Sequence, residues 1–271
     1  MSLVISEVTK YGIAMVADQA ISEHNKSKNT LITGRKQWKK LLKVPKLIGA
    51  VSYWGDIGLI CGRQRFDGWL QKRIDGGNYS DLSSFADFLA DELNKAAGGR
   101  KLLYPVGLHV AGIHAWGDGV RRPTFFHVHN GHGCLPRIAI GEPGTRGYQE
   151  YFDWQWAPRT LFERHDDYPD PGLPVADIVS SFETKGYLTR NGDIGHYIVI
   201  SEAIQSASEL LNLVPNVKFP KNPGCLGSRV GYLHFLMNTV VNIYKISTIP
   251  KIIGGTPSTI GIYPDGTYLR T

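Results

Sequence analysis

Cysteine is scarce in this chain, and long apolar runs are absent. The three cysteines, Cys61, Cys134 and Cys225, form no CxxC pair, and their odd number argues against a disulfide framework. A reducing compartment is therefore the simpler expectation. No apolar stretch approaches the roughly 20 residues that a membrane-spanning helix needs, and the first residues lack the basic and apolar segments of a signal peptide. We expect a cytoplasmic protein with no membrane partner.

The composition is that of a folded globular protein. Apolar residues make up 42% of the 271 positions and charged residues 20%, which excludes a disordered chain. The length predicts one domain over residues 1–271. The formal net charge is only +6, and much of the basic excess falls within residues 35–46. Because no nucleic-acid-binding motif accompanies this run, we interpret it as a solvated face and expect no nucleic-acid partner.

Hydrophobic periodicity predicts strands and helices in separate blocks. Residues 3–9 and 13–17 are apolar runs joined by a tight turn, which is a hairpin signal. Helical spacing follows within 55–74, and again from an N-cap at Asp81 to about Ala97. This order favours antiparallel sheets packed with helices rather than βαβ winding. Further strands are expected at 38–44, 47–53, 106–115, 124–128 and 137–140, helices at 144–157, 175–184, 197–212 and 229–246, a hairpin at 258–270, and loops at 22–30, 166–174 and 214–228.

Ser2 directly follows the first methionine of the sequence. A small second residue usually permits removal of that methionine, which would leave Ser2 with a free α-amine. The pKa of an α-amine is about 7.7–8.0, so it can act as a base near neutrality. An N-terminal hydroxyl residue that uses its own amine as base is a known solution for acyl transfer. Serine is common at this position, so the surrounding pattern has to carry the argument.

Four segments supply that pattern, and together they resemble the proteasome β-subunit family, to which the bacterial ATP-dependent peptidases with proteasome-like rings belong. In this family the nucleophile opens the first strand and an aspartate ends the second strand sixteen residues later, which is the spacing of Ser2 and Asp18. The family lysine, often the second of a Lys-Lys pair, corresponds to Lys40. The glycine that closes the next strand corresponds to Gly55, fifteen residues after Lys40. The segments read SLVI at 2–5, GIAMVAD at 12–18, KKLLKV at 39–44 and IGAVSYWGD at 48–56.

The resemblance covers about 1–150 and 229–271, and leaves about 150–228 as an unmatched expansion. It implies an α+β fold, namely the four-layer αββα sandwich of two antiparallel sheets flanked by helices that N-terminal-nucleophile hydrolases share. The chain departs from the family in carrying serine where threonine is the rule. Before Gly254-Gly255 it also lacks the aspartate and serine that the family places there.

The resemblance further implies the hydrolysis of amide bonds in peptides or proteins without a cofactor. Ser2 would be the nucleophile after removal of Met1. Lys40 would favour the developing negative charge, and Asp18 would keep Lys40 charged and oriented. The N–H of Gly55 would face the oxyanion. The family also implies a closed homo-oligomeric ring and an ATPase unfoldase as partner.

Two expectations concern surfaces. We expect Phe66 and Trp69, on the helices at 55–97, to be exposed anchors for a neighbouring subunit. We expect the expansion at 150–228 to form an appendage beside the sheet edge, at the rim of the active-site cleft, and not a domain with its own sheet.

Three alternatives remain open from the residues alone. One is an amidase on the same fold that acts on a small molecule, and another is a non-catalytic proteasome-like subunit that builds an assembly. The third is a metal-binding module at His127, His129 and His132, since strand alternation places the first two on one face and three histidines can bind zinc. We favour histidines on a surface strand over this metal site.

Overall fold

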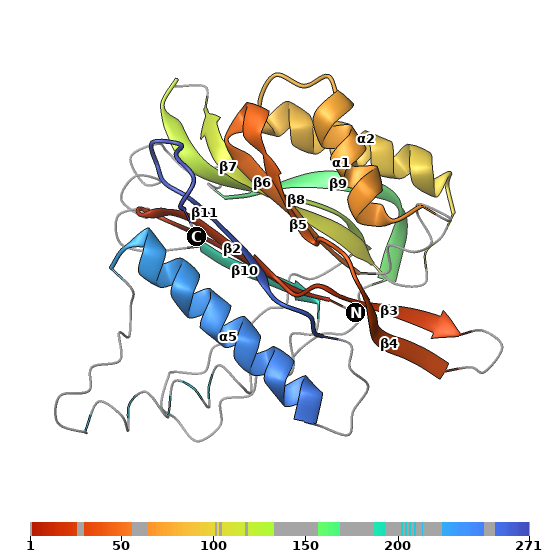
Figure 1. Cartoon of the computed structure of the whole chain (residues 1–271). Coiled ribbons are helices and arrows are strands. Elements are labelled where there is room, and N and C mark those ends of the chain that lie inside the picture. The colour runs from red at the N-terminus through yellow and green to blue at the C-terminus, as the bar shows by residue number, and fades with distance from the viewer. Residues whose placement is uncertain are drawn as a thin grey trace.

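Figure 1 shows the computed structural model of the chain. The structure describes residues 2–25, 30–55, 64–100, 102, 105–116, 119–132, 157–168, 187–192, 202, 204, 206, 209, 213, 224–246 and 253–270. In chain order the elements are β1 (Leu3–Thr9), β2 (Gly12–Ala17), β3 (Ala20–Asn25), β4 (Thr30–Gln37), β5 (Leu41–Val44), the 3-10 helix η1 (Pro45–Leu47), β6 (Gly49–Gly55), α1 (Phe66–Gly76), α2 (Leu82–Ala97), β7 (Val106–Ala115), β8 (Arg121–His132), β9 (Ala157–Tyr168), β10 (Tyr187–Gly192), α5 (Leu226–Ile246) and β11 (Ser258–Ile262).

The strands form two large antiparallel sheets and one projecting hairpin. One sheet has the order β10-β1-β2-β11, and the other has the order β5-β6-β7-β8-β9. Within the described residues, β3 and β4 pair only with each other, and they extend away from the body at the end where the N-terminus lies (Figure 1). The predicted first hairpin is confirmed as β1 and β2, with Val4 opposite Ala17 and Thr9 opposite Gly12.

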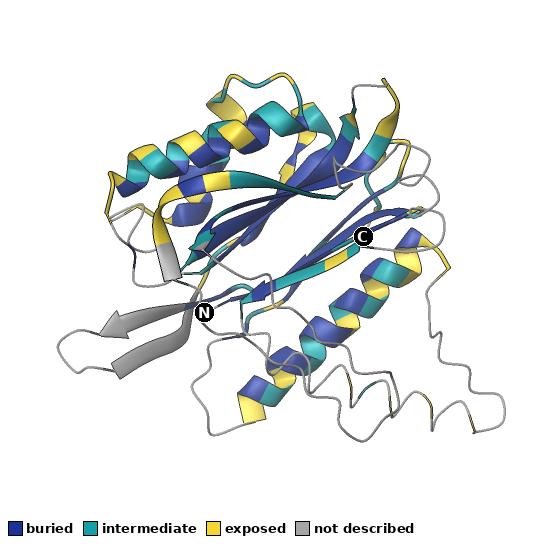
Figure 2. Ribbon diagram, turned by 180° about the vertical axis from the view of Figure 1, so that it is seen from behind, coloured by how far each residue is buried: buried dark blue, intermediate teal, exposed yellow. Residues whose placement is uncertain are grey.

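Three apolar cores hold these elements together. One lies between the two large sheets, where Met15 of β2 and Phe125 of β8 belong to the same buried cluster. A second joins α1 and α2 to the outer face of the five-stranded sheet, and a third joins α5 to the outer face of the four-stranded sheet. Figure 2 shows the result, with buried residues on the facing strands and exposed residues on the outer sides of the helices. The α+β class with antiparallel sheets is confirmed.

Helix α2 illustrates how the local sequence sets these elements. The Asp81 side chain accepts a hydrogen bond from the Ser84 N–H, and the Ser84 hydroxyl accepts one from the Asp81 N–H, which makes a reciprocal capping box. Gly98 ends the helix in the left-handed conformation. Between these caps, Phe85, Leu89 and other apolar residues at helical spacing face the core. Both ends of α2 agree with the prediction.

Several local predictions need correction. Residues 22–25 are not a loop, because β3 runs to Asn25, and Thr30 already belongs to β4. Residues 26–29 of the predicted loop lie outside the described residues. Residues 166–168 are not a loop either, since they end β9, and Gly55 ends β6 instead of beginning a helix. Helix α1 begins at Phe66, and residues 56–63 lie outside the described residues. In each case the strand or boundary lies in polar sequence, where apolar periodicity gives little signal. Residues 202, 204, 206 and 209 are helical, as expected for 197–212, and the elements expected at 137–140, 144–156 and 175–184 lie outside the described residues.

Two described strands of the expansion at 150–228 belong to the two large sheets. Its strand β9 pairs with β8 and forms the edge of the five-stranded sheet. Its strand β10 pairs with β1 and forms the edge of the four-stranded sheet. For these two strands the predicted appendage is wrong, and most of the remaining expansion lies outside the described residues. An edge strand is held largely by backbone hydrogen bonds, so its sequence can be polar and leave no clear apolar signature.

Phe66 and Trp69 are not exposed anchors. Their side chains are buried at 0% and 4% exposure, and Phe66 packs against both Trp69 and Tyr53. They face the sheet because they lie on the inward side of α1, where an amphipathic helix places its largest apolar residues. Within the described part of the chain, no helix is both long and apolar enough to cross a lipid bilayer.

Candidate active site

The candidate site is centred on Asp18, immediately after β2. Its Oδ1 accepts hydrogen bonds from the Lys40 Nζ at 2.8 Å and from the Leu3 N–H at 2.9 Å. The side chains of Asp18 and Lys40 are both 0% exposed. The Asp18 N–H in turn donates to the Leu3 carbonyl, which locks the ends of β1 and β2 together. The structure thus brings together the aspartate and the lysine that the sequence spacing pairs.

The second carboxylate oxygen of Asp18 is also fully engaged. Its Oδ2 accepts from the Ala20 N–H at 3.1 Å and from the Gly254 N–H at 3.2 Å. The Gly254 carbonyl accepts from the N–H groups of Gln19 and Ala20. Asp18 therefore ties together β1, β2, Lys40 before β5 and the chain that leads into β11. A buried carboxylate needs such a set of donors to offset its lost hydration.

Lys40 lies just before β5, where its carbonyl accepts a hydrogen bond from the Tyr53 N–H and so extends the β5–β6 pairing. Burial lowers the pKa of Lys40 below its ordinary value, and the attraction and hydrogen bond of Asp18 act in the opposite direction. The interpretation of residues 35–46 as a solvated face therefore fails at this position. The lysine is an internal cation that depends on Asp18.

Ser2 precedes β1 and is buried. The next residue, Leu3, is the one whose N–H binds Asp18, so Ser2 is one peptide unit away from the ion pair. Leu3 is also the register partner of Gly192 in β10. A Cβ placed on Gly192 would lie 1.6 Å from the Ser2 carbonyl oxygen, so the expansion packs its backbone directly against the candidate nucleophile residue.

Gly55 ends β6, where it pairs with Val106 of β7. Its φ is +90°, a conformation that favours glycine. A Cβ at this position would lie 2.2 Å from the Pro105 carbonyl oxygen. A glycine is therefore required both by the backbone conformation and by the close approach of the neighbouring strand.

His127 of β8 is buried and so does not lie on a surface face of the strand. His127 and His129 share one face, as predicted, with ring centroids 4.5 Å apart. Nδ1 of His127 lies 3.5 Å from Oδ2 of Asp167 on β9, the strand that pairs with β8. Among the described residues, no group of three His, Cys, Asp or Glu side chains could hold a metal ion. The side chain of His132, the third candidate, lies outside the described part.

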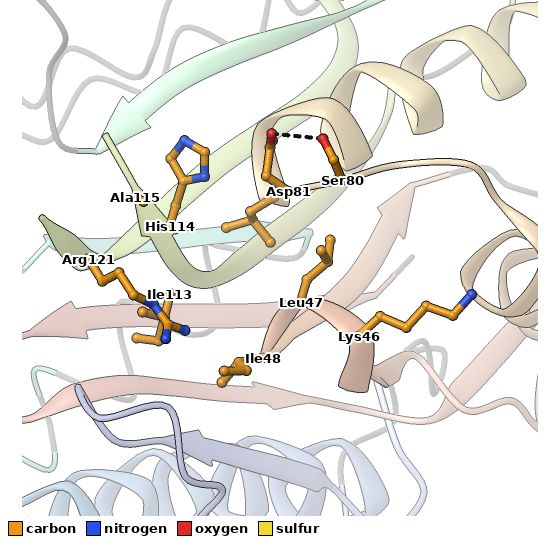
Figure 3. Close-up of a pocket in the computed structure, with 10 residues that line it drawn as sticks. Lys46, Leu47, Ile48, Ser80, Asp81, Ile113, His114, Ala115 and Arg121 are labelled. Atoms are coloured by element: carbon orange, nitrogen blue, oxygen red, sulfur yellow. Dashed lines mark hydrogen bonds between the residues drawn. The ribbon is translucent and has the colours of Figure 1, made fainter. Parts of the chain in front are cut away.

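A separate hollow of about 210 Å³ lies beside η1 and the start of α2 (Figure 3). Lys46, Ile48, Asp81, His114 and Arg121 are among its lining residues, and none of the four candidate catalytic residues lines it. Asp81 accepts a hydrogen bond from the Ser80 hydroxyl here. The Asp81 carboxylate also caps α2. Because no candidate catalytic residue lines this hollow, it is distinct from the candidate site.

The chain matches known proteins in structure only. No protein-family model matches the sequence, and no curated protein matches it. Among solved structures, the chain is similar to the Anbu (Gly-1) mutant from Hyphomicrobium sp. strain MC1, with 10% identity, a TM-score of 0.48 and coverage of 100% of this chain and 85% of that chain. It is also similar to Anbu (ancestral beta-subunit) from Yersinia bercovieri, with 10% identity, a TM-score of 0.46 and coverage of 98% and 83%.

Proposed function

We propose that the protein is an N-terminal-nucleophile hydrolase of the proteasome β-subunit type, which cleaves amide bonds in peptides with Ser2 after removal of the preceding methionine. In this proposal the sheets and helices are the αββα sandwich of that fold. The observation that carries the proposal is the buried Asp18–Lys40 ion pair, whose carboxylate also holds the N–H of the residue after Ser2.

The free α-amine of Ser2 is the base in this mechanism. It accepts the proton of the Ser2 hydroxyl while Oγ attacks the carbonyl carbon of the scissile amide. The tetrahedral intermediate collapses, the C–N bond breaks, and the leaving amine takes the proton from the α-ammonium. The acyl group remains on Oγ as an ester, which water hydrolyses with the α-amine again acting as the base.

The other three residues support this step through charge and geometry. The Lys40 cation lowers the pKa of the adjacent α-amine and favours the negative charge that develops during attack. Asp18 keeps Lys40 in place, because an unpaired ammonium is costly in the interior. The Gly55 N–H donates to the oxyanion. None of these roles requires a cofactor.

The first experiment measures the N-terminus and the turnover together. Intact mass should show the loss of one methionine residue, and a denatured peptide mixture should be cleaved by the wild type but not by the Ser2→Ala variant. Retained methionine and no cleavage would support the non-catalytic assembly subunit instead. A third result would support an amidase that acts on a small molecule. In that case the methionine is lost and a small acylating reagent such as a β-lactone modifies Ser2, but the peptides are not cleaved.

The assembly belongs to the same proposal. A closed homo-oligomeric ring would confine the nucleophile to a chamber, and an ATPase unfoldase would deliver protein substrates to it. Light scattering at micromolar concentration is expected to show a ring of many copies. A single chain in solution would contradict the ring, although it would leave the chemistry of Ser2 to its own test.

A further inference from the structure

A row of four histidines crosses the five-stranded sheet on the face that looks toward the four-stranded sheet. His109 belongs to β7, His127 and His129 to β8, and His165 to β9. The ring centroids of His109 and His127 lie 5.1 Å apart, those of His127 and His129 4.5 Å, and those of His129 and His165 4.1 Å. The row leads from the buried interior, at His109, to the edge strand that the expansion supplies.

The contacts of His127 determine which of its nitrogens carries the proton. The indole Nε1–H of Trp54 donates to His127 Nε2 at 3.1 Å. An indole N–H can only donate, so Nε2 is the bare nitrogen and the proton of the neutral ring is on Nδ1. Nδ1 lies 3.5 Å from Oδ2 of Asp167. Burial holds the pKa of His127 at about 3, so the ring is neutral at physiological pH.

Asp167 is itself fixed by the expansion. It lies on β9, and its Oδ2 accepts a hydrogen bond from the Tyr187 hydroxyl of β10 at 3.3 Å. Two strands of the expansion thus present one carboxylate oxygen to His127. An acceptor on the Nδ1 side favours the tautomer in which Nε2 is free to accept from Trp54.

Trp54 connects this support to the candidate site. It is the residue before Gly55, so its carbonyl and the Gly55 N–H belong to one planar peptide unit. The indole also passes closely over Gly107 of β7, where an added Cβ would lie 2.6 Å from Trp54 Cζ2. The side chain is therefore held on one side by the glycine and at its nitrogen by His127.

We propose that His127 is a positioning residue that fixes the Gly55 peptide through Trp54, and that Asp167 of the expansion sets the tautomer required for this. The proposal rests on the proposed function, in which the Gly55 N–H donates to the oxyanion. His127 touches neither Ser2 nor a substrate in this account. It acts by restricting the orientation of one backbone donor, and such restriction is a large part of oxyanion stabilisation.

The first readout is the indole N–H resonance of Trp54 in nitrogen-15 spectra of the full chain, identified by its loss in Trp54→Phe. In His127→Phe the resonance should move upfield and exchange faster with water, because its acceptor is gone. His127→Gln should restore it, since the amide oxygen can accept. Asp167→Ala should weaken the hydrogen bond from the Trp54 indole to His127 and so shift the resonance part of the way upfield. Asp167→Asn should leave the resonance at its wild-type position. His165→Phe, which changes the ring that stacks on His129, is the matched control and should leave it in place.

The second readout is the acylation of Ser2 by a β-lactone, which reacts with the nucleophile by ring opening. His127→Phe should lower the limiting rate of acylation about tenfold and leave the half-saturating concentration unchanged, with His127→Gln close to the wild type. An unchanged indole resonance or an unchanged limiting rate in His127→Phe would overturn the proposal. If His127→Phe does not fold, Asp167→Ala compared with Asp167→Asn gives the same test.

The acylation rates of two variants distinguish failure of the proposed function from failure of the positioning role. If Ser2→Ala reacts with the β-lactone as fast as the wild type, the proposed function is wrong, and the positioning role falls with it. If Ser2→Ala is inert while His127→Phe reacts at the wild-type rate, only the positioning role is wrong.

Discussion

Lys40 Nζ and Asp18 Oδ1 are 2.8 Å apart, and neither side chain is exposed to solvent. The ion pair is unlike a surface salt bridge, whose contribution to stability is small. In the interior, each charge depends on the other and on the backbone donors around it. This relationship makes both the stability and the proposed chemistry of the site depend on two residues that lie 22 positions apart in sequence.

Removal of Asp18 should therefore destabilise the protein strongly. Asp18→Ala leaves Lys40 buried without its carboxylate and should lower the free energy of unfolding by about 3–5 kcal/mol. The neutral pair Asp18→Asn with Lys40→Met should cost less than the sum of its two single variants, because each single change isolates a charge or a polar group. Urea unfolding of the four proteins checks this. Additive losses would contradict a coupled buried pair.

Gly55→Ala should damage both the fold and the acylation of Ser2. Its φ of +90° and the Pro105 carbonyl oxygen, 2.2 Å from an added Cβ, leave no room for alanine. We expect a loss of at least about 1 kcal/mol in the free energy of unfolding. Gly68→Ala is the control, because Gly68 lies exposed within α1 with open space around it, and it should stabilise by about 0.5–1 kcal/mol. Equal effects of the two changes would refute the steric argument.

Gly192→Ala tests whether β10 supports the N-terminus. An added Cβ would lie 1.6 Å from the Ser2 carbonyl oxygen, so β10 must move away from β1. We expect slower acylation of Ser2 and faster hydrogen exchange at Val4 and its neighbours in β1, which pair with β10. Gly227→Ala in α5, where an added Cβ meets nothing within 4 Å, should change neither measurement. Unchanged exchange in Gly192→Ala would show that the contact is unimportant.

Ser2, Asp18, Lys40 and Gly55 were identified in the sequence through the resemblance to the proteasome β-subunit family. Each of them lies at the end of a strand with an apolar sequence or directly beside one. The second half of the Asp18 environment was not visible. It comes from the N–H groups of Ala20 and Gly254, and a backbone donor has no residue-specific signature.

The histidine row was missed for a different reason. Two of its members, His127 and His129, follow strand alternation, but the row continues to His165 of β9, which is an edge strand in polar sequence. The partners of His127 are Trp54 and Asp167, which only the folded sheet brings beside it. Local periodicity cannot predict which strand will pair with another when a long unmatched segment separates the two strands in sequence.

The histidine row should make stability depend on acid. Burial holds the pKa values of His109, His127 and His129 at about 3, below their ordinary value. The unfolded chain therefore binds more protons between about pH 6.5 and 3, and stability falls as the pH falls through this window. The loss is up to about 1.4 kcal/mol per pH unit for each histidine. Asp167, whose pKa burial raises, offsets part of it.

Urea midpoints at pH 7 and pH 5 measure this dependence. His129→Gln should reduce the difference between the two midpoints, because it removes one of the three histidines while keeping a polar side chain. The reduction is expected to be about one third if the three contribute equally. A wild type that is equally stable at both pH values would contradict the buried neutral row.

The most direct test of the central claim is the location of a covalent adduct. The native protein is incubated with a β-lactone, digested, and mapped by mass spectrometry. We predict a new N-terminal peptide that begins at Ser2 and carries the added mass of one ring-opened lactone on Oγ, together with no adduct in Ser2→Ala. An N-terminal peptide that retains Met1 without adduct, or an equal adduct on another residue in both proteins, would contradict the claim that Ser2 is the nucleophile.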